Sequence, residues 1–327
     1  MKSWICKAFG EEPVLIDCDD PIAASGQVVI DIAACGVNFA DTLILQGKYQ
    51  KRPTGPFAPG FEIAGTIRAI GGDVADFAVG DRVMALPDWG GYGEKIAVDA
   101  ALVTRLPDVV GFHAAAAFQI AYGTSWFGLK YRANVQPGEV VLVHGAAGGV
   151  GLTAVECAKL LGATVIATAG GAEKCAIAQS HGADFVIDYK TQSIRDRVKE
   201  ICAGIGRTGA DVVYDPVGGD VFDQSLRCVA PGARILLIGF ASGSVPQIPA
   251  NILLVKNVAA LGFYFGAYLE QNPEIARAGM TELLGLLSSG AISPMISATY
   301  ELADAMDALS AIRDRTATGK LVIRCGA

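Results

Sequence analysis

A glycine-rich turn is the feature whose residue types and spacing point most directly to chemistry. The segment Val140–Gly151 reads Val-Val-Leu-Val-His-Gly-Ala-Ala-Gly-Gly-Val-Gly, which is typical of a buried strand that runs through a turn into a helix. Gly148, Gly149 and Gly151 would let the backbone approach a pyrophosphate and let the helix pack closely on its strand. Ala146 replaces the usual first glycine. The strand, turn and helix context nevertheless predicts a nicotinamide dinucleotide on the helix N-terminus.

The residues after the next predicted strand favour NADPH over NADH. The strand at 164–168 is followed by Ala-Gly-Gly at 169–171, so no acid stands where one would bind the ribose hydroxyls of NADH. Glu173 lies nearby, and we interpret it as a favourable charge at a helix N-terminus.

The elements that must position this turn form a regular alternation from Val140 onward, which is typical of a doubly wound parallel sheet. We predict six strands, at 140–144, 164–168, 185–188, 211–215, 234–239 and 258–263. The helices between them are expected at 150–161, 172–181, 193–203 and 220–229. Gly162, Gly182, Gly209 and Pro231-Gly232 lie where helices must end.

The first 120 residues have short strands and many Gly and Pro residues, which predicts a mainly β domain with strands at 26–34, 61–70 and 80–86. A linking helix is expected at 112–130. The final segment predicts helices at 274–289 and 301–313 and a strand at 320–324, and it should return to the first domain. We therefore expect an α/β protein with a discontinuous substrate domain, residues 1–122 and 267–327, and an inserted cofactor domain, residues 123–266. The active site is expected in a cleft between them.

The composition excludes several classes of protein. A chain of 327 residues, 52% hydrophobic and 18% charged, is long enough for two buried cores. Its net charge of -7 gives no basic face, so we expect no nucleic-acid partner. Apolar runs fall short of the ~18–20 residues of a membrane-spanning helix, and residues 1–13 do not resemble a secretory signal. We therefore expect a soluble, cytoplasmic protein with no membrane partner and with reduced cysteines.

Motifs spread over nearly the whole chain carry a family resemblance. They are Gly36-Val37-Asn38-Phe39-Ala40-Asp41, Gly47-Lys48-Tyr49, Pro59-Gly60-Phe61-Glu62-Ile63-Ala64-Gly65, Gly80-Asp81-Arg82-Val83, Ala146–Gly151 and Val213-Tyr214-Asp215-Pro216-Val217-Gly218-Gly219. With these motifs the chain resembles the zinc-independent quinone oxidoreductases of the medium-chain dehydrogenase/reductase superfamily. The resemblance implies a GroES-like β domain split by a six-stranded Rossmann domain, NADPH as the cofactor, and a homodimer formed through the sixth strand.

The zinc-dependent alcohol dehydrogenases of the same superfamily differ at their metal ligands. Asn38 stands at the position of their first ligand, a cysteine, and Phe61 at that of their second, a histidine. Glu62 remains, but one carboxylate cannot build a three-ligand zinc site. No cysteine lies between Val83 and Glu94, where their structural-zinc lobe would fall. We expect no metal.

The resemblance also implies a set of cofactor contacts. These are Thr124, Ala147, Gly148, Gly149, Val150, Gly151, Lys174, Tyr189, Gly239, Phe240, Phe263, Phe265 and Lys320. Lys174 and Tyr189 match positions that contact the 2′-phosphate, where a cation and a phenol suit the charge. Some of these residues have a simpler alternative: Lys174 and Lys320 as exposed lysines, Thr124 as an ordinary helical residue, and the phenylalanines as core or dimer interface.

Two residues are catalytic candidates. By resemblance Asn38 faces the nicotinamide and polarises a substrate carbonyl through its amide; alternatively it is a turn residue that satisfies local backbone. Tyr49 is either an aromatic wall or a proton donor. His144, beside the cofactor turn, is interpreted as a structural hydrogen-bonding residue.

The function expected from these residues is the zinc-independent, NADPH-dependent reduction of a small quinone or related conjugated carbonyl. Without a metal, the rate would come from near-attack geometry and from donors such as Asn38 aimed at the developing oxyanion. Two alternatives stay open: an enoyl-thioester or 2-alkenal reductase in which Tyr49 is catalytic, and an NADPH-binding protein without catalysis, as in crystallin-like relatives.

Overall fold

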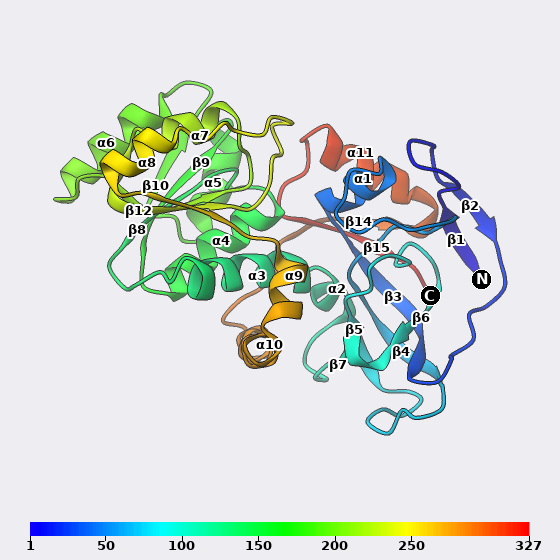
Figure 1. The fold of residues 1–327 in the computed structure, drawn as a ribbon. Coiled ribbons are helices and arrows are strands. Elements are labelled where there is room, and N and C mark those ends of the chain that lie inside the picture. Colours follow the sequence, from blue (N-terminus) through cyan, green and yellow to red (C-terminus); the bar gives the residue numbers. More distant parts are fainter. Residues whose placement is uncertain (327) are drawn as a thin grey trace. The chain divides into compact units, whose positions relative to one another are not determined.

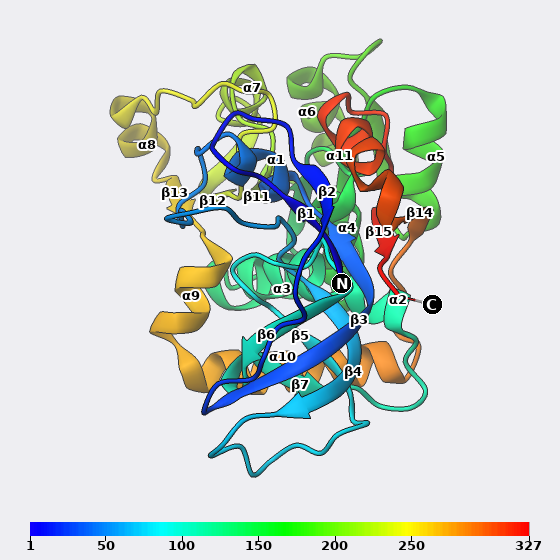
Figure 2. The ribbon, with the colours of Figure 1, turned by 90° about the vertical axis from the view of Figure 1, so that its right-hand side faces the viewer.

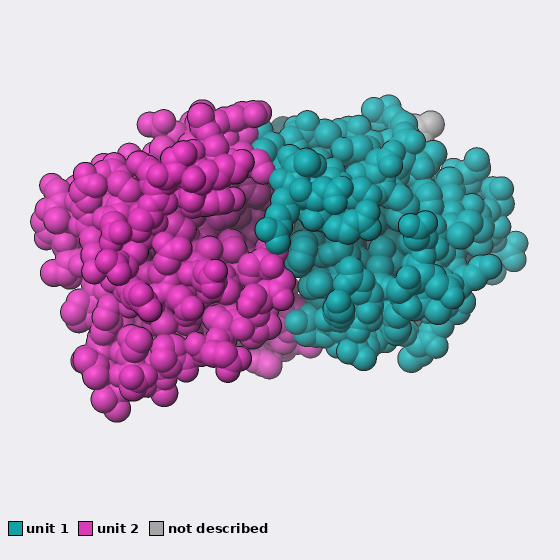
Figure 3. Space-filling view, turned by 90° about the horizontal axis from the view of Figure 1, so that it is seen from above, with its two compact units in different colours: residues 1–120, 287–327 teal, residues 121–286 magenta. Residues whose placement is uncertain are grey.

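The computed structural model describes residues 1–326 (Figure 1). The chain divides into two compact units (Figure 3): unit 1 comprises Met1–Ile120 together with the chain from Leu287 onward, and unit 2 comprises Ala121–Leu286. Among the helices of the described residues, none is long and apolar enough to cross a membrane.

Unit 2 is built on a six-stranded parallel sheet, as the alternation of strands and helices predicts. Its order is β10-β9-β8-β11-β12-β13, the 3-2-1-4-5-6 order of a Rossmann fold. The strands are β8 (Val140–Val143), β9 (Thr164–Ala169), β10 (Phe185–Asp188), β11 (Ala210–Asp215), β12 (Val229–Leu237) and β13 (Ala259–Gly262). The helices predicted between them are α4 (Gly149–Leu160), α5 (Ala172–Ser180), α6 (Ile194–Gly204) and α7 (Asp220–Ser225). The six strand predictions and the fold class are confirmed.

One boundary in unit 2 is wrong in the sequence prediction. The helix expected at 220–229 ends at Ser225, and β12 begins at Val229 instead of residue 234. Val229 pairs with Ala210 before the chain passes through Pro231-Gly232, and the ladder resumes at Arg234 with a shift in register. A Pro-Gly turn inside the strand looks like the end of an element in the sequence, although pairing resumes beyond it.

The predicted single helix at 112–130 is also wrong. The structure has three segments there: α2 (Phe112–Ala116), α3 (Gln119–Trp126) and a π-helix at Phe127–Arg132. In unit 2, two helices were not predicted at all, α8 (Ala250–Lys256) and α9 (Phe265–Gln271). Both are only two turns long, which is too short for a helical period to stand out.

Unit 1 is mainly β, as predicted. A two-stranded sheet joins β1 (Lys2–Ile5) to β2 (Val14–Asp17), and a seven-stranded sheet has the order β14-β15-β3-β4-β5-β7, with β6 pairing to β3. The larger sheet contains β3 (Gln27–Val37), β4 (Ile63–Ile70), β5 (Arg82–Ala85), β6 (Lys95–Asp99) and β7 (Val103–Arg105). A helix absent from the prediction, α1 (Phe39–Leu45), follows β3 directly. This is the GroES-like layout.

The C-terminal segment contributes strands to the sheet of unit 1. After α10 (Pro273–Ser288) come β14 (Ile296–Glu301), α11 (Ala305–Arg313) and β15 (Lys320–Arg324). β15 pairs antiparallel with β3 and parallel with β14 (Figure 2). The two helices and the last strand were predicted, whereas β14 was not. The core of unit 1 forms where apolar residues of β3, such as Ile30 and Ile32, meet Leu309 of α11 and Leu321 of β15.

Candidate active site

The glycine-rich turn of unit 2 connects β8 to α4. All four residues of β8 are buried, and α4 begins at Gly149 with Gly148 as its N-cap. The N–H groups of residues 149–151 belong to the first turn, where no carbonyl four residues earlier in the helix can accept them. No side chain caps this end of α4, and its first turn contains no acid. The N-terminus is therefore an open, electropositive backbone site suited to an anion.

The turn has room for backbone only. A Cβ on Gly151 would lie 2.1 Å from the carbonyl oxygen of Gly145, a distance that no side chain tolerates. Gly145 has a φ of 59°, in the left-handed region that favours glycine. A cradle of this kind fits the pyrophosphate of a dinucleotide, because main-chain groups approach the phosphates directly.

A second turn lies at the carboxyl end of β9. Residues 169–171 carry no acid, and Asp188 at the end of β10 accepts hydrogen bonds from the backbone N–H groups of Gly171 (2.8 Å) and Lys190 (3.0 Å). These bonds hold the pKa of Asp188 below its usual value. The Asp188 carboxylate therefore stabilises the conformation of this turn.

Tyr189 and Lys174 flank this second turn. A Cβ on Gly170 would lie 2.6 Å from the Tyr189 hydroxyl oxygen, so the phenol lies directly over the turn backbone, and Tyr189 is 50% exposed. Lys174 is half-buried in the first turn of α5. A phenol and a cation thus stand beside a turn whose own residues 169–171 carry no acid, and the nearby Asp188 carboxylate is occupied by two backbone N–H groups. A 2′-phosphate suits the phenol and the cation.

His144 is a structural residue, as its environment shows. The ring is completely buried, with Nδ1 3.0 Å from the Thr168 hydroxyl and Nε2 2.8 Å from the Ser225 hydroxyl. Ser225 donates its own proton to the carbonyl of Val221, so it must accept from Nε2–H, and Nδ1 accepts from Thr168. Burial lowers the pKa of His144. The neutral ring therefore joins β8, β9 and α7.

The remaining unit 2 candidates differ in what their side chains contact. Phe263 is 8% exposed, and its ring centroid lies 5.3 Å from that of Tyr268. The ring of Phe265 lies 5.7 Å from that of Phe127, at a tilt, and fills the space that the missing side chain of Gly123 leaves on α3. Phe263 is buried, whereas Phe265 is half-buried. Thr124 is nearly buried in α3, whereas Phe240, next to Gly239, is 37% exposed and packs on the turn at Gly218.

Unit 1 contains a buried polar cluster that we call the Lys320 cluster: Lys320, Glu62 and Asn38. The Lys320 ammonium donates to Glu62 Oε1 at 2.6 Å, to Asn38 Oδ1 at 2.7 Å and to the carbonyl of Val37 at 3.0 Å. Asn38 Nδ2 donates to the same Glu62 oxygen at 2.8 Å, and Glu62 Oε2 accepts the N–H of Ile120 at 2.9 Å. The three side chains are 4%, 0% and 8% exposed.

The sheet brings this cluster together from three distant parts of the chain. Asn38 follows the last residue of β3, Glu62 precedes the first residue of β4, and Lys320 opens β15. Because β3 pairs antiparallel with both neighbours, these strand ends meet at one edge. Gly36 makes the room, since a Cβ there would lie 2.5 Å from Glu62 Oε1 and 2.1 Å from the carbonyl oxygen of Ala116.

Asp41 supports the Asn38 backbone from within α1. Its carboxylate accepts the N–H of Asn38 at 2.7 Å, the N–H of Gly60 at 2.9 Å and the hydroxyl of Tyr92 at 3.3 Å. The side chain is completely buried, and burial raises the pKa of Asp41 to about 7 although these bonds and the positive charge of Lys320 act against the rise. The loops before β4 and before β6 are thereby tied to the N-terminus of α1.

Tyr49 lies in an aromatic wall of unit 1. Its ring centroid is 5.0 Å from that of Phe61, and both belong to a cluster with Ile44, Phe57 and Trp89. Phe61 is 6% exposed. The arrangement fits the prediction of an aromatic wall as well as that of a proton donor, because Tyr49 is only half-buried.

Sequence reasoning missed the partners of Asn38. Lys320 was predicted either to contact the cofactor or to be an exposed lysine. The exposed alternative is wrong, because the side chain is 4% exposed and its three donors contact protein oxygens. Asp41 and Tyr92 were assigned no role. The sequence does contain a pattern that indicates the Lys320–Glu62 pair. Glu62 and Lys320 each precede apolar β residues, Ile63-Ala64 and Leu321-Val322-Ile323. Charged side chains in such apolar surroundings are buried only when they are paired.

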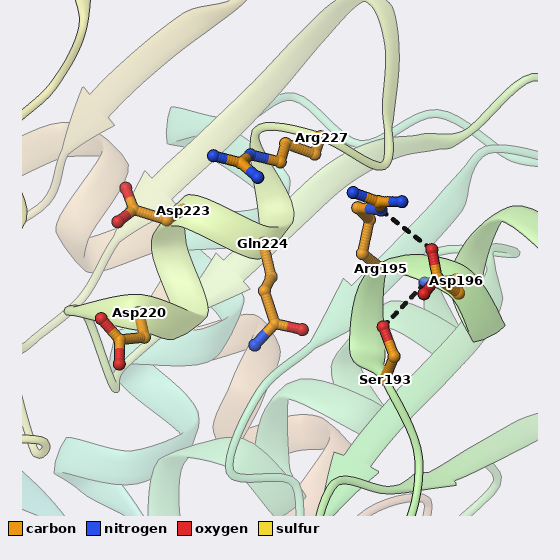
Figure 4. Close-up of a pocket in the computed structure, with 7 residues that line it drawn as sticks. All are labelled: Ser193, Arg195, Asp196, Asp220, Asp223, Gln224 and Arg227. Carbon is orange, nitrogen blue, oxygen red and sulfur yellow. Dashed lines mark hydrogen bonds and ion pairs between the residues drawn. The ribbon is translucent and has the colours of Figure 1, made fainter.

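Two further observations concern possible sites. Within residues 1–326, no group of three or more His, Cys, Asp or Glu side chains is arranged to hold a metal ion. A polar surface pocket of about 350 Å³ lies in unit 2 at the start of α6 and along α7 (Figure 4). It is lined by Ser193, Arg195, Asp196, Asp220, Asp223, Gln224 and Arg227. None of these is a predicted site residue, and Asp196 is bound within the pocket by Arg195 and by its own backbone N–H to Ser193.

Comparisons with known proteins agree with this architecture. Residues 24–108 match the alcohol dehydrogenase GroES-like domain, and residues 149–283 match the zinc-binding dehydrogenase family. The chain is 43% identical over 326 residues to the quinone oxidoreductase-like protein 2 homolog of Nematostella vectensis, covering 98% of this chain and 88% of that protein. It is 33% identical to the synaptic vesicle membrane protein VAT-1 homolog of Rattus norvegicus, covering 93% of this chain and 78% of that protein.

A solved structure shows the same fold with its cofactor. The Escherichia coli quinone oxidoreductase complexed with NADPH superimposes with a TM-score of 0.92 at 30% identity, covering 99% of this chain and 100% of that chain. The relatives and the fold together establish that this chain belongs to the zinc-independent quinone oxidoreductase family of the medium-chain dehydrogenase/reductase superfamily.

Proposed function

We propose that the protein is an NADPH-dependent reductase of quinones or related electron-poor conjugated carbonyls. The observation that carries the proposal is the uncapped, acid-free N-terminus of α4 behind the turn that only glycine can form at Gly151. The quinone oxidoreductase relatives, one of them solved with NADPH, support the cofactor and the substrate class.

The proposed NADPH contacts of unit 2 follow from the two turns. Backbone N–H groups of Ala147, Gly149, Val150 and Gly151 bind the pyrophosphate. Gly148 lets the backbone approach it, since its own N–H donates to the carbonyl of Gly145 at 2.9 Å. Lys174 and Tyr189 bind the 2′-phosphate. Thr124, Gly239 and Phe240 remain proposed contacts. The rings of Phe263 and Phe265 pack against aromatic neighbours of unit 2, so their proposed contribution is to position the backbone beside the cofactor.

The proposed chemistry of unit 1 rests on Asn38 and Tyr49. NADPH, when bound, supplies a hydride. The Asn38 amide donates a hydrogen bond to the acceptor oxygen as negative charge develops there, a role that preorganised donors perform well in a water-poor site. Tyr49 and Phe61 supply apolar aromatic surface for a planar acceptor, and the Tyr49 hydroxyl or solvent returns the proton.

The assembly proposed for this enzyme is a homodimer formed at β13. Among residues 1–326 this strand pairs only with β12, so its outer edge is unpaired in the sheet. The preceding helix α8 exposes Leu254 and Val255 by 77% and 76%. An exposed strand edge beside apolar side chains is suited to pairing with a second chain. Light scattering should give a dimer for the wild type and a monomer for Leu254→Asp/Val255→Asp; a wild-type monomer would overturn the proposal.

The test of function is an anaerobic assay of NADPH oxidation, with NADH as the control nucleotide. The acceptors are 1,4-benzoquinone, 9,10-phenanthrenequinone, crotonyl-CoA and 2-hexenal, each with and without a chelator. We expect chelator-insensitive turnover of the quinones with NADPH preferred. No oxidation with any acceptor would overturn the proposal.

Two alternatives are separated by the same assay. Turnover confined to crotonyl-CoA or 2-hexenal, abolished by Tyr49→Phe, would assign reduction of a carbon–carbon double bond. Tight NADPH binding without turnover would favour a binding protein. This alternative is kept because one relative, the 33% identical VAT-1 homolog, is named for a synaptic vesicle membrane and not for an enzymatic activity.

A further inference from the structure

We propose that Lys320 is a positioning residue for Asn38 and not a ligand of the cofactor. The inference rests on the proposed function for its kinetic consequences, whereas its geometric basis lies entirely within unit 1. Lys320 Nζ contacts three acceptor atoms from two separate segments of the chain: Val37 O and Asn38 Oδ1 at the end of β3, and Glu62 Oε1 before β4.

The first step concerns the donors of the ammonium. A lysine ammonium has three hydrogens and accepts nothing. The three acceptors at 2.6–3.0 Å use all three hydrogens, and the side chain is 4% exposed. No hydrogen is left for a phosphate or a carboxamide, so a cofactor contact would require an existing bond to break.

The second step concerns the orientation of the amide. Lys320 can only donate, so the Asn38 atom facing it must be the oxygen. The carboxylate of Glu62 can only accept, so the atom facing it must be the nitrogen. The opposite flip would place the amide N–H₂ against the ammonium and the amide oxygen against the carboxylate. The Lys320–Glu62 pair therefore fixes one rotamer and one flip of Asn38.

The third step concerns the donor left for a substrate. One Nδ2 hydrogen is bound to Glu62 Oε1 at 2.8 Å, whereas the other, within the described part of the chain, contacts only the carbonyl of Gly36 at 3.4 Å. A contact of that length is weak, so this hydrogen is the one that a substrate oxygen can take. The positive charge at Oδ1 polarises the amide and makes its N–H a stronger donor.

The test uses two variants that separate charge neutralisation from positioning. Lys320→Met removes the ammonium and leaves Glu62 buried without its partner. Lys320→Met/Glu62→Gln removes both charges, so no uncompensated charge remains. The matched control is Lys159→Met, which removes a lysine paired with Asp184 at the surface of unit 2. The readouts are kcat and KM for the quinone, the Kd of NADPH from fluorescence titration, and thermal unfolding.

We expect both Lys320 variants to lose roughly tenfold to hundredfold in kcat, while the Kd of NADPH stays within about twofold of the wild type, a change too small to represent a lost ion pair. The double variant should regain thermal stability but not kcat. A large rise in the Kd of NADPH would show that Lys320 is a cofactor ligand. Recovery of kcat in the double variant would show that Lys320 only compensates the charge of Glu62. Either result overturns the proposal.

A measurement that needs no turnover keeps the proposal testable if the proposed function fails. In wild-type protein with selectively ¹⁵N-labelled asparagine, the Asn38 side-chain amide, assigned with Asn38→Ser, should exchange its hydrogens slowly. In the double variant the side chain introduced by Glu62→Gln can still accept from Asn38 Nδ2, but the Lys320 donor that holds Asn38 Oδ1 is gone, so exchange should be at least about tenfold faster. Equal exchange rates in the two proteins would show that Lys320 does not hold the amide and would overturn the proposal independently of any activity.

Discussion

Lys320 and Glu62 form an ion pair that is almost completely withdrawn from solvent. Nζ and Oε1 are 2.6 Å apart, and the side chains are 4% and 0% exposed. The two residues are 258 positions apart in the sequence, so the pair joins the last strand of the chain to the start of β4. A buried pair of this kind costs stability when one partner is removed, because the other charge is left without compensation.

Glu62→Gln should therefore destabilise the protein by about 3–5 kcal/mol, whereas Lys320→Met/Glu62→Gln should cost much less. Urea unfolding followed by circular dichroism measures both. Equal destabilisation by the single and the double substitution would mean that the bonds to Asn38 and Ile120 matter more than the charges.

Gly151→Ala should weaken NADPH binding without unfolding the protein. The added Cβ would lie 2.1 Å from the carbonyl oxygen of Gly145, so the turn must open and its N–H groups move away from the phosphates. We expect the Kd of NADPH to rise by roughly tenfold or more, the loss of one or two charge-assisted hydrogen bonds. Fluorescence titration measures the Kd. Gly204→Ala in α6 is the control, since a Cβ there meets nothing within 4 Å; an unchanged Kd for Gly151→Ala would remove the turn from the proposed cofactor site.

Lys174→Ala should reduce the preference for NADPH over NADH. A lysine beside the acid-free turn interacts with the 2′-phosphate that only NADPH carries, and a charge-assisted bond contributes about 1.5–3 kcal/mol. The KM for NADPH should therefore rise by roughly tenfold or more, while that for NADH stays the same. Lys190→Ala, an exposed neighbour, provides the comparison. If Lys174→Ala raises the KM for NADPH and the KM for NADH by the same factor, the residue does not recognise the 2′-phosphate.

Asp41 should make the protein less stable as the pH rises from about 4 to about 7. Burial raises its pKa from 3.8 to about 7 in the folded state. Over that interval the folded protein holds a proton that the unfolded chain has released, so stability falls with rising pH and levels off above the folded pKa. Asp41→Asn should lack this contribution, although it loses an acceptor for one N–H group.

The check for Asp41 is the free energy of unfolding of wild type and Asp41→Asn at several pH values between 4 and 8. The advantage of the wild type over the variant should shrink by a few kcal/mol toward high pH. A difference between the two proteins that does not change with pH would show that Asp41 titrates in the folded state as it does in the unfolded chain.

The sequence by itself determined the Rossmann sheet of unit 2 and its phosphate turn. The apolar runs of β8 to β13 are local patterns punctuated by glycine, and parallel strands buried on both faces leave such runs in any sequence. The spacing of Gly148, Gly149 and Gly151 is local as well, because one strand–turn–helix segment makes the whole cradle. Because the prediction depends on local patterns, it missed short or interrupted elements. The helices α8 and α9 are only two turns long, and β12 contains Pro231-Gly232.

Only the tertiary structure decided what surrounds Asn38. Its amide is oriented by Glu62 and Lys320, and its backbone by Asp41, through a sheet edge at which β15, β3 and β4 meet. No local pattern encodes that meeting, because strand pairing over 258 positions depends on how β15 packs against β3 and α11. A lysine in a sequence is an exposed cation by default. Lys320 is a buried one because the fold surrounds it with three oxygens that repay its loss of water.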